Sequence, residues 1–324
     1  MINILIAGCG QLGSRHLQAL SKLDSTYSIL VYDPIQSSLN TAKERYDSVS
    51  IQKSPKCLFY NDLNKIPKND IDVAIVATSA NVRYELLISL ISLFDIKNII
   101  LEKVLFQSQE QLNSAKFIIN EKNINTWVNC PRRQYSIYKN IKSKIKGKPI
   151  LSMSVNGNGW GLACNAIHFI DLWNLFDNFK SYQIKWDNKF KTIESKRCGF
   201  KEILGGFSAE SSNSKLNIYC ENEDQEDVVI TIKLQGFHIE INEKVGNATF
   251  LNDENKVIDI IDFKTPYQSE LTNEVVENII KNGSCDLTSF DVSYMLHQEF
   301  LGSMIDKMYP NSDSAKEKKL VPIT

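Results

Sequence analysis

The chain has 324 residues, a length that suits two domains of ordinary size better than one small core. Its 37 basic and 38 acidic residues nearly cancel, so its charge excludes nucleic acid and anionic membranes as the main partner. No run approaches the roughly 18 consecutive apolar residues that a membrane-spanning helix needs, so no membrane partner is expected.

The cysteines and the first residues indicate the compartment. Seven cysteines are scattered along the chain without a C-x-x-C pair. An odd number in this arrangement favours reduced thiols over disulfides or a zinc site. Met1 and Ile2 lead directly into an apolar run, so no leader peptide is expected. These features predict a cytoplasmic protein without a metal site.

Up to about residue 130 the chain alternates short apolar runs with amphipathic ones. Strands that alternate with helices lie parallel, so the pattern predicts an α/β domain with a doubly wound parallel sheet over residues 1–128. The expected strands are Ile2–Ala7, Ile29–Tyr32, Leu58–Tyr60, Val73–Ala77, Asn98–Leu101 and Thr126–Asn129. The expected helices are Leu12–Leu23, Ser38–Tyr46, Val82–Phe94 and Ser108–Glu121.

A glycine-rich turn joins the first expected strand to the first helix. The turn reads Gly8-Cys9-Gly10-Gln11-Leu12-Gly13. The first glycine permits the tight turn, the second lets a diphosphate approach the backbone, and the third lets helix and strand pack closely. The helix N-terminus offers unpaired N–H groups to the phosphates. Asp33, after the second strand, can bind ribose hydroxyls and repel a 2′-phosphate, so the pattern predicts an NAD(H) site.

Two further segments follow buried strands at the edge where such sheets bind ligands. The segment 77–81 follows the fourth strand and can place small polar groups along the coenzyme. Glu102 and Lys103 follow the fifth strand. Beside a nicotinamide, burial and the oxidised ring would both oppose the charge of Lys103, which would prepare it to polarise a carbonyl or accept a hydroxyl proton. The alternative is a surface lysine that pairs with Glu102.

From Lys148 onward strands follow one another, which predicts an α+β domain over residues 129–324 with a mainly antiparallel open sheet. The expected strands are Ile150–Val155, Tyr182–Trp186, Lys215–Tyr219, Val228–Leu234, His238–Asn242, Ala248–Leu251 and Val257–Ile261. The helices expected to flank this sheet are Ala163–Phe176, Glu270–Lys281 and Ser289–Tyr309. The acidic run 222–227 is interpreted as a solvated hairpin turn, and 311–319 as a linker.

A second glycine-rich segment, 156–161, leads into a helix that carries Cys164 and His168 on one face, with Asn165 beside it. Histidine is the usual general acid–base, and Asp171 could orient it. The alternative is a core histidine held by a backbone carbonyl. The remaining histidines, His16, His238 and His297, are expected to be structural.

Together these motifs resemble the Gfo/Idh/MocA oxidoreductases over essentially the whole chain. The residues that carry the resemblance are Gly8, Gly10, Gly13, His16, Asp33, Ala77, Thr78, Glu102, Lys103, His168, the segment 129–133 and the closing 321–324. The resemblance implies a Rossmann domain, then an α/β domain whose open sheet carries the substrate pocket and often the oligomer interface. It also implies NAD(P)-dependent oxidation or reduction at a sugar or cyclitol carbon, with Lys103 beside the nicotinamide and His168 transferring the proton.

Three departures from the family pattern stand out. Val104 replaces the proline that usually follows the lysine. Ser79 and Arg83 stand where a proline and a histidine are usual. Cys164 occupies the place of the catalytic aspartate, and a thiol substitutes poorly for a carboxylate. Either Asn165 and Asp171 compensate, or Lys103 and His168 act alone, or the activity is lost or altered.

The sequence therefore predicts an NAD(H)-dependent oxidoreductase that acts on a secondary alcohol or ketone of a sugar, a sugar phosphate or a nucleotide sugar. It is expected to form a homo-oligomer, a dimer or a tetramer. The residues expected to bind the coenzyme are Gly8, Gly10, Gln11, Leu12, Gly13, Asp33, Thr78, Ser79, Arg83, Glu102 and Lys103. Those expected to bind substrate are Arg132, Arg133, Trp160, Cys164, Asn165 and His168, the last of which is catalytic together with Lys103. Trp160 is expected to stack on a sugar, and the paired arginines to hold an anionic group unless they are simply solvated. The alternatives are an NAD-retaining sugar lyase or hydrolase, and a non-catalytic NAD-binding subunit or sensor.

Overall fold

The computed structural model describes residues 1–67, 70–222, 224, 226–308 and 320–324. The chain forms two compact units. The first comprises Met1–Phe106, Glu110–Pro131 and Pro266–Asp291, and the second comprises Gln107–Gln109, Arg132–Thr265 and Val292–Thr324. The expected linker at 311–319, and positions 223 and 225 of the acidic run, lie outside the described residues.

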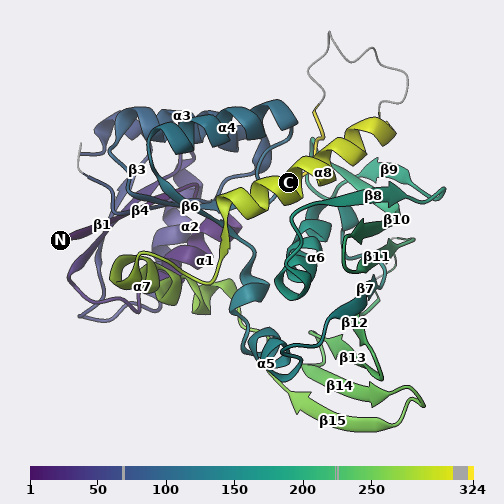
Figure 1. Ribbon diagram of the computed structural model, residues 1–324. Helices are drawn as coiled ribbons and strands as arrows, with labels where there is room; N and C mark the ends of the chain where they lie inside the picture. Colours follow the sequence, from purple (N-terminus) through teal and green to yellow (C-terminus); the bar gives the residue numbers. More distant parts are fainter. Residues whose placement is uncertain (68–69, 223, 225, 309–319) are drawn as a thin grey trace. The chain divides into compact units, whose positions relative to one another are not determined.

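A seven-stranded sheet forms the centre of the first unit (Figure 1). Its strands are β1 (Ile2–Ala7), β2 (Tyr27–Tyr32), β3 (Lys56–Tyr60), β4 (Val73–Val76), β5 (Asn98–Glu102), β6 (Asn125–Asn129) and β16 (Thr288–Ser289). Their order is β16-β6-β5-β4-β1-β2-β3, and every neighbouring pair is parallel except β16 with β6. Strand β4 is apolar throughout and β1 is apolar except for Asn3, because helices cover both faces of the sheet. The predicted doubly wound parallel sheet is confirmed.

Five α-helices flank this sheet. They are α1 (Gln11–Leu20), α2 (Gln36–Asp47), α3 (Ala80–Leu93), α4 (Gln109–Glu121) and α7 (Thr272–Asn282). Figure 1 shows α3 and α4 on one face of the sheet and α1, α2 and α7 on the other. Helix α7 was expected to flank the antiparallel sheet, and that expectation is wrong. Its buried Val276 and Ile279 belong to the same core as Leu20 of α1, because an amphipathic pattern shows that a face is buried but not against which partner.

A nine-stranded, mainly antiparallel sheet forms the second unit, as predicted. Its strands are β7 (Ile150–Asn156), β8 (Tyr182–Trp186), β9 (Lys191–Glu194), β10 (Lys201–Ser211), β11 (Lys215–Cys220), β12 (Val229–Leu234), β13 (Phe237–Asn242), β14 (Asn247–Asn252) and β15 (Val257–Asp262). The order is β15-β14-β13-β12-β7-β11-β10-β8, with β9 paired to β10, and β7 runs parallel to β11. The sequence analysis missed β9 and β10.

Three helices belong wholly or largely to this unit: α5 (Ser136–Lys144), α6 (Leu162–Asp177) and α8 (Phe290–Met308). The sequence analysis also missed α5. Helix α6 packs on β7, β10 and β11. Helix α8 packs on β8, where the Tyr182 hydroxyl donates to the carbonyl oxygen of Leu296 at 2.6 Å and the Trp186 indole donates to Ser303 Oγ at 3.1 Å. Among the described residues, no helix is long and apolar enough to cross a membrane.

Candidate functional site

The three glycines of the first turn have different surroundings. Gly8 has a φ of +89°, and a Cβ there would lie 2.5 Å from Cγ2 of Thr78. A Cβ on Gly13 would lie 1.9 Å from the carbonyl oxygen of Gly8. A Cβ on Gly10 would meet nothing within 4 Å. The first and third glycines are therefore required by the turn and its packing, while the second borders open space.

The N-terminus of α1 is open toward that space. Gly10 is its N-cap residue, no side chain caps the helix, and its first turn carries no acidic residue. The first N–H groups of a helix have no intrahelical acceptor and carry a partial positive charge, so this end suits a diphosphate. Arg45 of α2 adds a cation here by donating to Ser14 Oγ at 2.6 Å and to Gln11 Oε1 at 2.7 Å. Sequence reasoning missed Arg45 because nothing local marks it as a neighbour of the turn.

Asp33 ties the end of β2 to the glycine turn. Its carboxylate accepts hydrogen bonds from the backbone N–H of Cys9 at 2.8 Å and of Ile35 at 2.9 Å. A carboxylate has about four acceptor positions, so these two bonds leave capacity for ribose hydroxyls. Burial and the nearby Asp33 carboxylate raise the pKa of the Cys9 thiol to about 12, so this thiol stays protonated beside the turn.

Thr78 offers a further polar atom beside the turn. Its Oγ1 is buried and has no hydrogen-bond partner within the described part of the chain. A buried hydroxyl without a partner is costly and calls for a ligand or an ordered water. Ser79, the N-cap residue of α3, donates from its hydroxyl to Asn81 Oδ1 at 2.7 Å. These groups, with the open end of α1, fit an adenine dinucleotide.

Glu102 lies in a buried hydrogen-bond network at the end of β5. It is 3% exposed, and its Oε1 accepts from His16 Nε2 at 2.9 Å and from Asn129 Nδ2 at 2.5 Å. His16 Nδ1 lies 2.8 Å from Thr272 Oγ1, so this histidine is structural, as expected. Burial would raise the pKa of Glu102, but His16, Asn129 and the charge of Arg83 outweigh it and lower that pKa.

Arg83 was expected to bind the coenzyme, but the structure places its side chain in the interior. It is 1% exposed and donates to the carbonyl oxygen of Leu105 at 3.0 Å and to those of Val104 and Thr78. Burial lowers its pKa to about 10, against the attraction of Glu102. Arg83 therefore braces the loops after β4 and β5, because the carbonyl groups of those loops already occupy the guanidinium.

The second glycine-rich turn also precedes a helix, but the N-terminus of that helix is closed. Gly161 has a φ of +75°, and a Cβ there would lie 3.0 Å from Oε2 of Glu202. The Glu202 carboxylate accepts from the backbone N–H of Ala163 and, at 3.1 Å, from that of Ile203. A carboxylate thus satisfies the positive end of α6. The sequence analysis missed Glu202 because it missed β10, which carries it.

Helix α6 leaves one face accessible. Cys164, Asn165 and His168 are half-buried, whereas the residues between and beside them are buried. The predicted shared face of Cys164 and His168 is therefore present. Asp171 is fully buried and pairs with Arg133, whose Nε and Nη2 lie 2.8 and 2.9 Å from its two carboxylate oxygens.

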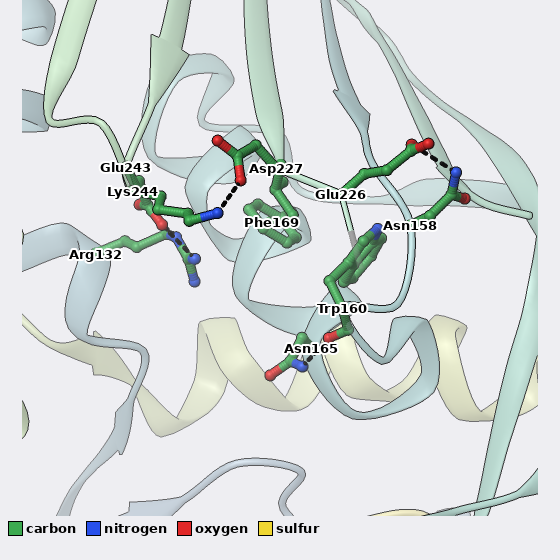
Figure 2. Close-up of a pocket in the computed structure, with 10 residues that line it drawn as sticks. Arg132, Asn158, Trp160, Asn165, Phe169, Glu226, Asp227, Glu243 and Lys244 are labelled. Atoms are coloured by element: carbon green, nitrogen blue, oxygen red, sulfur yellow. Dashed lines mark hydrogen bonds and ion pairs between the residues drawn. The ribbon is translucent and has the colours of Figure 1, made fainter. Parts of the chain in front are cut away.

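A pocket of about 380 Å³ lies in the second unit beside this face of α6 (Figure 2). It is lined by Arg132, Asn158, Trp160, Asn165, Phe169, Glu226, Asp227, Val228, Glu243 and Lys244. Three predicted substrate residues, Arg132, Trp160 and Asn165, meet here. The acidic and basic residues that join them come from turns between strands, which the sequence presents as ordinary surface turns.

Both arginines after β6 are paired with carboxylates. Arg132 donates to Glu243 from Nε at 2.8 Å and from Nη2 at 2.7 Å, and Tyr138 donates to the same carboxylate at 2.6 Å. Burial would raise the pKa of Glu243, but Arg132 and Tyr138 outweigh it and lower that pKa. Arg133 is committed to Asp171. Neither arginine is solvated, and neither offers an empty clamp for an anion, so that expectation is corrected.

Comparison with known proteins finds a family match for the N-terminal part of the chain. Residues 2–130 match the model of the Gfo/Idh/MocA oxidoreductase family, described as having an NAD-binding Rossmann fold. No curated protein matches the sequence. Among the described residues, no group of three or more His, Cys, Asp or Glu side chains could hold a metal ion.

Solved structures share the fold at low identity. A super-repressor mutant of Gal80p from Saccharomyces cerevisiae has a TM-score of 0.72 at 13% identity, covering 98% of this chain and 99% of that one. A Gfo/Idh/MocA family oxidoreductase from Vibrio cholerae has a TM-score of 0.69 at 14% identity, and the match covers 96% of this chain and 100% of that one. The UDP-N-acetylglucosamine 3-dehydrogenase GnnA from Acidithiobacillus ferrooxidans has a TM-score of 0.69 at 10% identity, and the match covers 94% of this chain and 96% of that one. Residues 2–130 are therefore similar to the NAD-binding Rossmann domain of the Gfo/Idh/MocA oxidoreductases.

Proposed function

We propose that the protein is an NAD(H)-dependent oxidoreductase that moves hydride between the nicotinamide and a secondary alcohol or ketone of a sugar derivative. The observation that carries the proposal is the open N-terminus of α1 at Gly10, with its uncapped N–H groups and no acidic side chain in its first turn. Anions bind such a helix end. The family match over the same residues supports NAD as the ligand.

The coenzyme would be held by the glycine turn, by Asp33 at the ribose, and by Thr78, whose buried hydroxyl is available. Arg45 strengthens the positive potential at the turn through Gln11 and Ser14. Ser79 and the backbone after Glu102 would also contact the coenzyme at this edge of the sheet. When bound, the coenzyme supplies the hydride acceptor or donor.

His168 and Lys103 are the proposed catalytic residues. His168, on the accessible face of α6, would take the hydroxyl proton during oxidation. Lys103 would stabilise the alkoxide that develops on the same carbon, and charge stabilised only in the transition state lowers the barrier. Cys164 lies one helical turn before His168, and its thiol would bind a substrate hydroxyl more weakly than the carboxylate of an aspartate would.

Two observations support a sugar derivative as the substrate class. The pocket of the second unit combines the aromatic rings of Trp160 and Phe169 with polar side chains, a combination suited to sugars. One structural neighbour is a UDP-N-acetylglucosamine 3-dehydrogenase. A cytoplasmic homo-oligomer, a dimer or a tetramer, remains part of this proposal.

Cys164 in the place of an aspartate favours a second candidate, a non-catalytic NAD-binding subunit or sensor. An NAD-retaining lyase or hydrolase is a variant of the leading proposal. To separate the three, the purified protein is mixed with NAD and a panel of sugars, and reduced nicotinamide is followed by absorbance. Growth of that signal supports the dehydrogenase. Product without the signal supports the lyase or hydrolase, and tight NAD binding with neither supports the sensor.

The variants Lys103→Ala and His168→Ala test the catalytic assignment. Each should lower turnover by about a hundredfold or more, because each removes a proton-transferring or charge-stabilising group. NAD affinity, measured by calorimetry, should stay near that of the unchanged protein. The controls are Lys22→Ala and His238→Ala, at an exposed helix end and on β13. Unchanged turnover in both test variants would remove these residues from the mechanism.

A further inference from the structure

We infer that the pocket of the second unit binds the part of the substrate that does not react, and that this part is an uncharged glycosyl unit. The inference rests on the proposed function and narrows its substrate class. Asn165 lines the pocket, and His168 is absent from the residues that line it. The two side chains are three residues apart on α6, about 5–6 Å between Cβ atoms. The part of the substrate that occupies the pocket therefore lies beside Asn165, and the part attached to it reaches His168.

The back wall of the pocket is a fixed aromatic surface. Phe169 is 2% exposed, the guanidinium carbon of Arg132 lies 4.4 Å from the centre of its ring, and Trp160 packs edge-on at 5.4 Å. The Trp160 indole is locked by hydrogen bonds to the carbonyl oxygens of Gly157 and Tyr219 at 3.0 and 3.1 Å. Figure 2 shows Arg132 and Trp160 on opposite sides of Phe169. Phe169 is thus covered, and the half-buried Trp160 that it supports presents the aromatic surface, which suits the apolar C–H face of a sugar ring.

The polar groups around this wall include one spare donor and one spare acceptor. Nη1 of Arg132 makes no hydrogen bond to any described residue, because Nε and Nη2 hold Glu243. Oδ1 of Asn165 is likewise without a donor in the described chain, since Nδ2 is used on the carbonyl oxygens of Trp160 and Gly161. Hydroxyl and amide groups both donate and accept, so a sugar hydroxyl or an acetamido group can use both atoms.

The charge of the pocket argues against an anionic ligand. Among the described residues that line the pocket, two cations, Arg132 and Lys244, face the three carboxylates of Glu226, Asp227 and Glu243, which leaves one net negative charge. Glu243 holds Arg132, and Asp227 holds Lys244. Within the described part of the chain, the carboxylate of Glu226 is bound only by the uncharged amide of Asn158, at 2.6 Å. A phosphate or carboxylate here would meet an unbalanced carboxylate and no unpaired cation, so the pocket discriminates against it.

Direct binding to the NAD-loaded protein tests the inference, by ligand-observed NMR titration with methyl β-glucoside, N-acetylglucosamine, glucose 6-phosphate and glucuronate. The two uncharged sugars should bind, and the two anions should bind at least about tenfold more weakly. Asn165→Leu should abolish sugar binding, whereas Asn213→Leu, on an exposed turn outside the pocket, should not. Glu226→Gln should reduce the discrimination against glucose 6-phosphate and leave the affinity for N-acetylglucosamine unchanged.

Turnover and NAD binding are measured separately, so the two proposals fail in different ways. Asn165-dependent binding of uncharged sugars without any hydride transfer would uphold the pocket and reject the oxidoreductase. Hydride transfer with anions bound as tightly as uncharged sugars, or with Asn165→Leu binding as before, would overturn the pocket inference. Absence of binding by all four compounds would overturn it too.

Discussion

The two glycine-rich turns of this chain begin alike and end differently. Each follows a strand and leads into a helix, β1 to α1 across Gly8–Gly13 and β7 to α6 across Gly157–Gly161. In the first, the helix N-terminus has no side-chain cap and Gly10 borders open space. In the second, the carboxylate of Glu202 occupies the helix N-terminus.

The difference shows what a glycine-rich turn can and cannot indicate. The turn supplies backbone room and points N–H groups outward in both places. Whether those groups serve a ligand depends on a residue far away in sequence, here Glu202 on β10. An anion site therefore needs the turn together with the absence of an internal carboxylate.

Of the variants that test this comparison, Gly13→Ala should have the largest effect, and the effect is on NAD affinity. The new Cβ would lie 1.9 Å from a backbone oxygen that cannot move aside alone, so the turn must shift. We expect NAD affinity to fall by about a hundredfold or more, as measured by calorimetry. Gly161→Ala is the matched change in the second turn and should leave NAD affinity unchanged. Equal losses in both would show that the turns are not functionally distinct.

Asp33→Ala should have a smaller effect, on coenzyme choice. Removing the carboxylate removes its repulsion of a 2′-phosphate, so the preference for NAD over NADP should fall by about tenfold. Dissociation constants for both coenzymes measure the change, with Asp47→Ala at the exposed end of α2 as control. Tighter binding of NADP than NAD by the unchanged protein would contradict the assignment of Asp33.

Glu202→Gln, in the carboxylate that occupies the N-terminus of α6, should have the smallest effect, and the effect is on stability. Glutamine keeps a hydrogen-bond acceptor but loses the charge at the positive end of α6, which should lower the free energy of unfolding by about 0.5–1 kcal/mol. Urea unfolding measures this, and NAD affinity should not change. Glu210→Gln, at an exposed ion pair on the same strand, should have less effect. If Glu202→Gln weakens NAD binding, the two turns are coupled.

Local patterns predicted most of the first unit, because its strands and helices alternate and its glycine turn is explicit in sequence. The second unit was less predictable. Strand β10 contains Gly205, with a φ of +114°, and Gly206, where a Cβ would lie 2.5 Å from the ring of Tyr219. Glycine is rare in strands, and here it serves a close approach that no local pattern reveals.

The candidate site was predictable only in part. The glycine turn, Asp33 and the accessible face of α6 follow from spacing along the chain. The partners of the paired arginines do not: Arg132 binds Glu243 and Arg133 binds Asp171, across 111 and 38 residues. The charge of the pocket depends on these long-range pairs, so the residues alone suggested an anion clamp that the fold does not provide.

The return of residues 266–291 to the first unit has a consequence for how this protein is made. His16 and the apolar side of α1 find some of their partners, Thr272 and Val276, in that late segment. A ribosome must therefore translate the chain through residue 291 before the first unit can complete its core. A fragment cut at the end of the family match would keep the glycine turn and lose α7, the helix that packs on α1.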